Sequence, residues 1–204
     1  METQYGFDVI VNRRNTNCGR WDTMDKKYGK SDMIHLGVAD MDFKAPEEIR
    51  NALHDVLDMG VLGYTDLSDK FFTSIQRWYK KQYNMDIPRE WIVFCPRINI
   101  ASSISVETYS EKGDGVIMHT PAYGPLQNAI LKNGRRMLAS PLKKNGERYE
   151  MDFEHMESLV DEHTKMMIMC NPHNPTGRAW TKEELVQAAD FCKKHDLILF
   201  TDEI

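Results

Sequence analysis

The sequence predicts an α/β fold with three layers, in which helices cover both faces of a mostly parallel β-sheet. Strand-like and helix-like segments alternate from residue 91 to the end of the chain, the order that builds parallel sheets. The run MMIMC at 166–170 is apolar at every position, as in a strand buried on both faces. Polar loop sequences follow the strand-like runs, where α/β proteins gather their ligands.

The N-terminal part of the chain differs in composition from the rest. Residues 1–45 are rich in Asn, Asp, Arg and aromatic residues, and they predict an irregular, extended arm that contains GVADMDF at 37–43. A helix is predicted after Pro46, because proline suits a first helical turn, and Gly60 ends its pattern. A second helix is expected after Ser68.

From residue 91 to residue 134, short apolar runs alternate with segments that have helical periodicity. WIVFC at 91–95 predicts a strand, and a helix is expected over 99–109. VIMHT at 116–120 predicts the next strand. The helix expected over 123–133 ends at Gly134, a residue that commonly terminates helices.

The last third of the chain carries turn and capping signals. Residues 136–142 are expected to be extended, and the following Asn145–Gly146 pair is typical of a hairpin turn. Asp152 can cap the next helix. After the strand predicted at 166–170, a Thr181 and Glu184 capping-box pair predicts another helix; LILFTDE at 197–203 is the final strand.

Composition narrows the class of protein. The net charge is −5 and no stripe of Lys or Arg occurs, which argues against nucleic-acid binding. No apolar run approaches the roughly 20 residues of a membrane span, and METQYGFDVIV is unlike a secretory signal. Four cysteines stand singly, so we expect a reducing, cytoplasmic location and no metal site.

Asp202 is the first candidate site residue, because it ends an apolar strand. A carboxylate there is costly unless a cationic group meets it. A protonated pyridine nitrogen would meet it, and keeping that nitrogen protonated makes pyridoxal phosphate an electron sink. An ordinary cap or ion pair is the alternative, and for a single aspartate it is the more frequent one.

The stretch CNPHNPTGRAW at 170–180 is the strongest local signal. Its two X-Pro bonds, Asn171–Pro172 and Asn174–Pro175, stiffen the loop and bias the preceding residues away from helix. Such a loop can hold the Asn174 amide against a phenolic oxygen. An ordinary turn is the alternative, since Asn, Pro and Gly are turn residues.

Three weaker signals lie at loops. Tyr123 in TPAYG offers a flat face for stacking on a heteroaromatic ring, or simply packs. RINIASS at 97–103 starts a helix whose N–H groups, with the Ser102 and Ser103 hydroxyls, can hold a phosphate. Tyr64 in GYTD reads equally well as a plain loop aromatic.

Together these residues resemble the fold-type-I pyridoxal-phosphate enzymes, the aspartate-aminotransferase superfamily, and within it the cystathionine β-lyase branch of MalY/PatB type (C–S lyases). The matching motifs follow the family order along nearly the whole chain: WD at 21–22, VADMDF at 38–43, GYT at 63–65, GDGVIMHTPAYGP at 113–125, CNPHNPTGRAWTKEEL at 170–185 and TDEI at 201–204. The resemblance implies that residues 46–204 form a pyridoxal-phosphate-binding large domain, and that the protein is a homodimer with its site at the interface.

Roles follow from the resemblance by position. It implies that Asp202 partners the pyridine nitrogen, that Asn174 donates to the phenolate oxygen and that Tyr123 stacks on the ring. It also implies a cis bond between Asn174 and Pro175.

The resemblance further implies a phosphate-binding turn at Ile98 and Asn99, and it implies that Tyr64 reaches the phosphate in the neighbouring subunit. The branch usually has Pro-Gly followed by two small apolar residues, whereas this chain has PRIN at 96–99. Arg97 therefore adds a charge near the phosphate position, together with a side chain where the family has none.

The Schiff-base lysine of the family is expected beyond Ile204, and so are the small C-terminal domain and the arginine that holds the substrate carboxylate. The chain is thus expected to contain a large domain that is incomplete at its C-terminus and no catalytic residue. Lys193 and Lys194 are expected on a solvated helix surface.

The implied activity is α,β-elimination on cystathionine or another cysteine S-conjugate, which gives pyruvate, ammonia and a thiol. A class I/II aminotransferase is one alternative, separable by its products. A catalytically inactive relative that acts as a binding or interaction module is the other. This chain alone is expected to be inactive, because general-base catalysis would need a replacement for the lysine.

Overall fold

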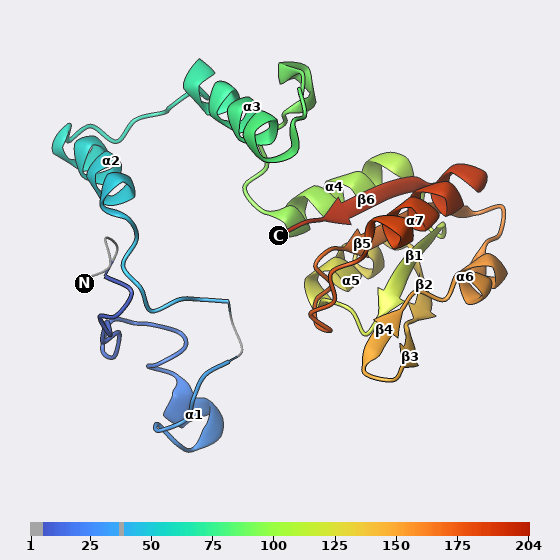
Figure 1. Ribbon diagram of the computed structural model, residues 1–204, viewed down its shortest axis with the longest axis horizontal. Coiled ribbons are helices and arrows are strands. Elements are labelled where there is room, and N and C mark those ends of the chain that lie inside the picture. The colour runs from blue at the N-terminus through green and yellow to red at the C-terminus, as the bar shows by residue number, and fades with distance from the viewer. Residues whose placement is uncertain (1–5, 37–38) are drawn as a thin grey trace. The chain divides into compact units, whose positions relative to one another are not determined.

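The computed structural model describes residues 6–36 and 39–204 (Figure 1). The chain divides into two compact units, Met1–Ile75 and Gln76–Ile204, which are considered separately below. The first two residues of GVADMDF, Gly37 and Val38, lie outside the described residues. The division into an arm at 1–45 and a large domain from residue 46 stays a prediction.

The described residues of the first unit form two whole helices and the beginning of a third. The short helix α1 spans Met24–Tyr28, a helix that the sequence did not predict. Helix α2 spans Glu47–Asp58 and is followed by Gly60, which has a φ of +72°. Helix α3 spans Asp69–Tyr83 and continues into the second unit. The two helices expected after Pro46 and Ser68 are therefore confirmed.

Polar side chains organise the irregular arm. Arg13 bridges Asp40 and Asp42 at 2.8 and 3.1 Å, and the indole of Trp21 donates to Asp42 at 3.0 Å. The hydrogen bond from Trp21 is the largest cause that lowers the pKa of Asp42. The WD and ADMDF motifs, some twenty residues apart, are thus held together through hydrogen bonds to charged groups, which are stronger than neutral ones.

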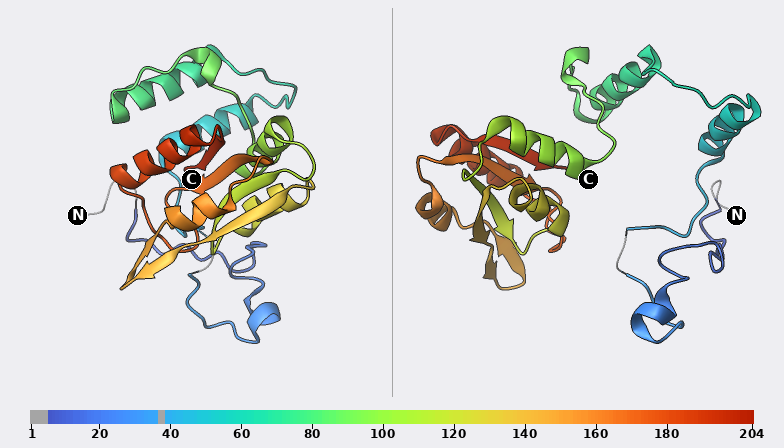
Figure 2. Two further views of the ribbon diagram at one scale, coloured as in Figure 1. Left: turned by 90° about the vertical axis from the view of Figure 1, so that its right-hand side faces the viewer. Right: turned by 180° about the vertical axis from the view of Figure 1, so that it is seen from behind.

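The second unit is built on a four-stranded parallel sheet in the order β2-β1-β5-β6 (Figures 1 and 2). The strands are β1 (Gly115–Thr120), β2 (Arg136–Pro141), β5 (Thr164–Cys170) and β6 (Ile198–Asp202). The predicted parallel sheet is confirmed, and the central β1 and β5 are the strands whose sequences are most uniformly apolar.

Helices cover both faces of this sheet, as predicted. Helices α4 (Ile98–Tyr109) and α5 (Gly124–Leu131) pack on one face, and α6 (Phe153–Leu159) and α7 (Lys182–Lys194) pack on the other. Neighbouring β5 residues face opposite ways: Ile168 packs with α4 and α5, whereas Met167 packs with α6 and α7. Each helix in the described residues is too short or too polar to cross a membrane.

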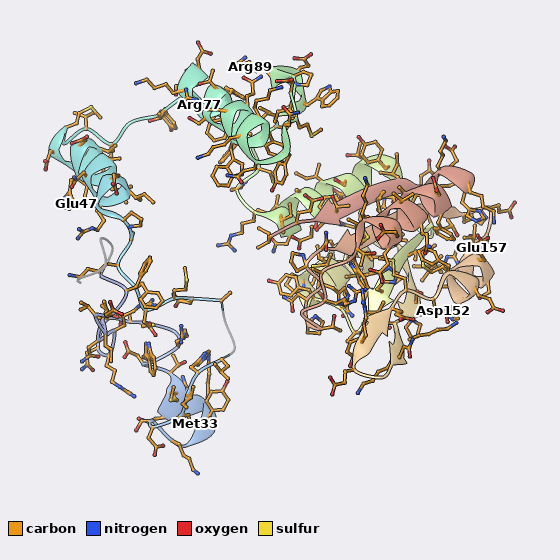
Figure 3. All side chains as sticks on the ribbon, in the orientation of Figure 1. Met33, Glu47, Arg77, Arg89, Asp152 and Glu157 are labelled. Atoms are coloured by element: carbon orange, nitrogen blue, oxygen red, sulfur yellow. The ribbon has the colours of Figure 1, made fainter. Side chains whose placement is uncertain are left out.

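The turn and cap signals are confirmed. Strands β3 (Lys143–Asn145) and β4 (Arg148–Glu150) form the expected hairpin, with Gly146 at a φ of +60°. Asp152 stands at the start of α6 and accepts the His155 N–H at 3.0 Å (Figure 3). The capping box at α7 is complete, because the Thr181 N–H donates to Glu184 at 2.7 Å and the Glu184 N–H donates back at 3.3 Å.

The strand predicted at 91–95 is wrong. Residues Arg89–Trp91 form a 3₁₀ turn, η1, and no strand of the described chain pairs with the extended residues that follow. Trp91 and Val93 are 68% and 85% exposed. An apolar run of this length indicates a preference for extended, buried backbone, but a strand also needs a neighbour with which to share hydrogen bonds.

β6 is an edge strand of the sheet. It pairs only with β5 among the described residues, and Ile198 on it is 42% exposed. Because an unpaired apolar edge promotes strand association, we expect Ile198→Lys to reduce concentration-dependent self-association of the chain, measured by sedimentation velocity. Val186→Lys, at a 50% exposed position on α7, is the matched control. A wild-type chain that stays a monodisperse monomer at high concentration would contradict this expectation.

Candidate functional site

The candidate site lies at the carboxyl edge of the parallel sheet. β1, β5 and β6 end there at Thr120, Cys170 and Asp202. The loops TPAYG and NPHNPTG leave from the first two strands, and α4 begins beside the end of β6 (Figures 1 and 2). Open α/β sheets bind ligands at this edge, so the topology brings the predicted loops to the expected place.

Asp202 is buried at the tip of β6, with 3% of its surface exposed. It shares the α4 side of the sheet with Cys170, its partner in the strand register. One carboxylate oxygen accepts the N–H of Ile204 at 3.1 Å. Among the described residues no cationic side chain pairs with this carboxylate, and it caps no helix. In the described residues Asp202 therefore has neither of the two ordinary roles considered as alternatives, a helix cap or an ion pair.

Asn174 lies in the loop that joins β5 to α7, and it is exposed. The bond between Asn174 and Pro175 is cis, as expected, and so is the bond between Asn171 and Pro172. Burial raises the pKa of the Cys170 thiol; the backbone N–H of Asn174 opposes this shift and the charge of Asp202 adds to it. The Cys170 sulfur therefore lies close to both Asn174 and Asp202, which places the two candidates at one end of the β5–β6 pair.

Tyr123 stands at the start of α5. Its backbone is extended, with φ −69° and ψ 117°, and its side chain is 39% exposed. The next two residues, Gly124 and Pro125, begin the helix. The ring is thus partly free at the carboxyl end of β1, where a stacking partner could reach it.

Ile98 and Asn99 open α4 after Arg97, whose backbone is extended. In the described chain the N–H groups of Ile98 and Asn99 donate no hydrogen bond, as is usual for the first turn of a helix. Arg97 is exposed, and no carboxylate of the described residues pairs with it. The expectation for Ser102 is wrong: its buried hydroxyl donates to the Asn99 carbonyl at 2.9 Å and is not free for a phosphate.

Tyr64 belongs to the first compact unit, and it is fully exposed. Its predicted contact with a phosphate in a neighbouring subunit stays a prediction. Lys193 and Lys194 occupy the last turn of α7, which leads into the beginning of β6 and so lies at the opposite edge of the sheet. Lys194 pairs with Glu157 at 2.7 Å, in line with the solvated surface position expected for it.

His119 is a buried residue that the sequence analysis did not single out. It lies in β1, within the strand predicted at 116–120, is 2% exposed, and neither ring nitrogen has a hydrogen-bond partner in the described residues. Its pKa is lowered from 6.5 to about 4, mainly by desolvation; the charge of the nearby His173 contributes to the lowering, and the Ser140 backbone opposes it. The alternation of VIMHT, which puts His119 on the same face as Ile117, was the signal that could have found it.

Trp180 was also missed, although it belongs to the quoted motif. It is 6% exposed and lies beneath the NPHNPTG loop. Its ring centroid is 5.6 Å from that of His173 and 6.1 Å from that of His119. A buried aromatic cluster thus supports the loop from the side of the sheet opposite to Asp202.

Known proteins resemble the chain in both sequence and structure. Cystathionine β-lyase PatB of Bacillus subtilis (strain 168) is 37% identical over 199 residues, which cover 97% of this chain and 51% of PatB. Protein MalY of Escherichia coli (strain K12) is 34% identical over 202 residues, which cover 98% and 52%. The chain spans about half the length of the curated relatives it matches.

Solved structures give the same result. The pyridoxal-phosphate-bound C–S lyase from Staphylococcus hominis superposes with a TM-score of 0.87 at 36% identity, covering 98% of this chain and 51% of that one. Cystalysin from Treponema denticola, whose crystal structure contains pyridoxal 5'-phosphate, superposes with a TM-score of 0.88 at 35% identity, covering 96% and 50%. Residues 31–204 match the family described as aminotransferase class I and II. The chain therefore belongs to the class I and II aminotransferase family.

Proposed function

We propose that this chain supplies the cofactor-holding part of a pyridoxal-phosphate-dependent carbon–sulfur lyase, which eliminates a thiol from cystathionine or another cysteine S-conjugate. The observation that carries the proposal is Asp202, a buried carboxylate at the carboxyl edge of the sheet with no cationic partner among the described residues. The named activities of PatB and of the Staphylococcus hominis protein support the lyase reaction.

The residues present fit this cofactor. A pyridinium nitrogen would give the buried Asp202 carboxylate the positive partner that the described chain lacks. The unbonded N–H groups at the start of α4 suit a phosphate, and Arg97 adds a positive charge beside them. Tyr123 offers a partly exposed ring at the same edge.

The chemistry divides between the cofactor and the chain. Pyridoxal phosphate, when bound, supplies an electron sink for the pair of electrons left when the substrate loses its Cα proton. Asp202 would hold a proton on the ring nitrogen, and Asn174 would donate to the phenolate oxygen. Tyr123 would cover one face of the ring and keep water from it. The lysine that moves the Cα proton is proposed to lie outside this sequence.

An aminotransferase is the second candidate, and the family match itself favours it. The two reactions share the residues named above and differ in products: a lyase releases pyruvate, ammonia and a thiol, whereas an aminotransferase yields a keto acid and pyridoxamine phosphate. A binding module without catalysis is the third candidate. A homodimer in the cytoplasm, in which Tyr64 completes the neighbouring site, is part of the proposal.

The first test is an absorbance titration of the 204-residue chain with pyridoxal phosphate, followed by borohydride. The proposal expects saturable binding that dialysis reverses even after borohydride, because no lysine of this chain forms the link. A borohydride-stable adduct on a single lysine, located by mass spectrometry, would show that the chain contains its own anchor. Absence of saturable binding would count against the cofactor role of these residues.

A further inference from the structure

We infer that Trp180 is a positioning residue, which fixes the Asn174 loop relative to Asp202 and so sets the geometry of the site. This inference rests on the proposed function, because it matters only if both residues hold the cofactor. Trp180 lies directly before the N-cap of α7 and is buried, on the side of the sheet opposite to the candidate site. It acts through hydrogen bonds rather than by touching a ligand.

Trp180 closes the loop at both ends. Its indole Nε1 donates to the Cys170 carbonyl at 2.9 Å, in a bond that is buried. Its backbone N–H donates to the side-chain oxygen of Asn171 at 3.1 Å. One residue therefore ties the end of the loop to the last residue of β5 and to the first residue of the loop.

The same two partners are linked to β6. The backbone N–H of Asn171 donates to the carbonyl of Asp202 at 2.8 Å, and Cys170 lies opposite Asp202 in the strand register. A chain of hydrogen bonds thus runs from Trp180 through Asn171 to the backbone of Asp202. The indole bonds Cys170, the chain neighbour of Asn171, so moving the indole would shift the backbone next to the residue that bonds the tip of β6.

Trp180 also supports the residue that precedes Asn174. The ring of His173 meets the indole edge-on, at 5.6 Å and 60°. Two further contacts hold His173. Its backbone N–H donates to the Arg178 carbonyl at 2.7 Å, and its ring Nδ1 lies 2.8 Å from the Thr176 hydroxyl. The backbone that carries Asn174 is therefore seated on the indole.

An arginine holds the indole from another direction. The Arg178 guanidinium lies 4.9 Å from the indole centroid, within the range of a cation–π interaction. Its Nε donates to the Tyr149 carbonyl at 3.0 Å, and its other end pairs with Glu184 of the α7 capping box. The ring is thus held by the loop, the hairpin and the start of α7 together.

The test compares Trp180→Phe with the wild-type chain. Phenylalanine keeps an aromatic ring but removes the donor to the Cys170 carbonyl, and a lost buried hydrogen bond corresponds to a roughly tenfold change in an equilibrium. We expect the dissociation constant for pyridoxal phosphate to rise about tenfold and the absorption maximum of the bound cofactor to shift. Trp78→Phe, at a 57% exposed position on α3, is the control and should leave both unchanged.

A readout without cofactor accompanies the titration. We expect amide hydrogen exchange at Asn171 to accelerate in Trp180→Phe, while exchange at Ile117 in the central strand stays as in the wild type, which also shows that the variant folds. If Trp180→Phe does not fold, Asn171→Ala removes the other tether, the bond from the Trp180 backbone N–H to the Asn171 side chain, and is expected to give a similar loss of affinity.

Three outcomes would count against the inference or its premise. Equal affinities and spectra for the wild type, Trp180→Phe and Trp78→Phe would overturn the positioning role while leaving the proposed function standing. Unchanged exchange at Asn171 would overturn the link between Trp180 and Asp202. A wild-type chain that takes up no pyridoxal phosphate would overturn the proposed function, and the inference with it, even if exchange showed the link to be real.

Discussion

Asp202→Asn is expected to weaken pyridoxal-phosphate binding by about 10- to 100-fold, the range that corresponds to losing one hydrogen bond to a charged group. Asparagine has nearly the same shape but no negative charge, so it cannot compensate a protonated ring nitrogen. Asp202 is 3% exposed, so its charge costs free energy without a cationic partner and stabilises a cation that binds beside it. Titration of the chain with the cofactor, followed by absorbance, measures the effect.

The same substitution is expected to leave the fold intact without cofactor. Removing a buried charge that has no cationic partner among the described residues relieves a desolvation cost, so the urea midpoint should stay the same or rise. Asp86→Asn is the matched control, because Asp86 pairs with Lys80 at an exposed surface, where ion pairs contribute little. Equal cofactor affinity for Asp202→Asn and the wild type would remove the main support for the proposed function.

The second large effect is acid destabilisation through His119. Burial lowers its folded-state pKa from 6.5 to about 4, so the unfolded chain binds the proton more readily than the folded chain. The full contribution of neutral His119 is therefore present above pH 6.5, declines as the pH falls towards 4 and is lost below that value. The loss corresponds to about 3 kcal/mol in the free energy of unfolding. Urea denaturation at a series of pH values between 7.5 and 4 measures it.

His119→Phe distinguishes the contribution of His119 to the pH dependence from the contributions of the other titrating groups. The variant should lose most of the decline between pH 6.5 and 4, and what persists should include His173, whose pKa is also lowered by burial. His54→Phe, on the exposed surface of α2, should keep the wild-type profile. If His119→Phe showed the same pH dependence as the wild type, the unpartnered buried imidazole would not be the source of the acid sensitivity.

Several features of the fold could be predicted from the sequence because they depend on local chemistry. The capping box at Thr181 and Glu184 needs only two side chains and one helical turn, and the Asn145–Gly146 turn needs only two residues. The apolar run at 166–170 predicted a strand buried on both faces, because every one of its five residues is apolar. These signals do not depend on distant segments.

Features that depend on distant partners could not be predicted in this way. The run at 91–95 has the composition of a strand, but pairing requires a neighbouring strand that the described chain does not provide. The burial of His119 could not be predicted, because the Trp180 ring that packs near it lies sixty-one positions further on. For Asp202 the sequence indicated a strand end, whereas its burial and the absence of a cationic partner among the described residues came only from the structure.

The sheet separates the apolar interior beside the candidate site from a second apolar interior on its other face. Met167 and Ile168 are adjacent in sequence, yet they belong to different apolar interiors divided by the sheet. Asp202 and Cys170 point to the interior lined by α4 and α5, so changes of volume beneath α6 and α7 are separated from them by a layer of backbone. Substitutions beneath α6 and α7 could therefore change the stability of the domain, and substitutions on the α4 and α5 side could change its chemistry. Trp180 should be kept, because it links the two sides.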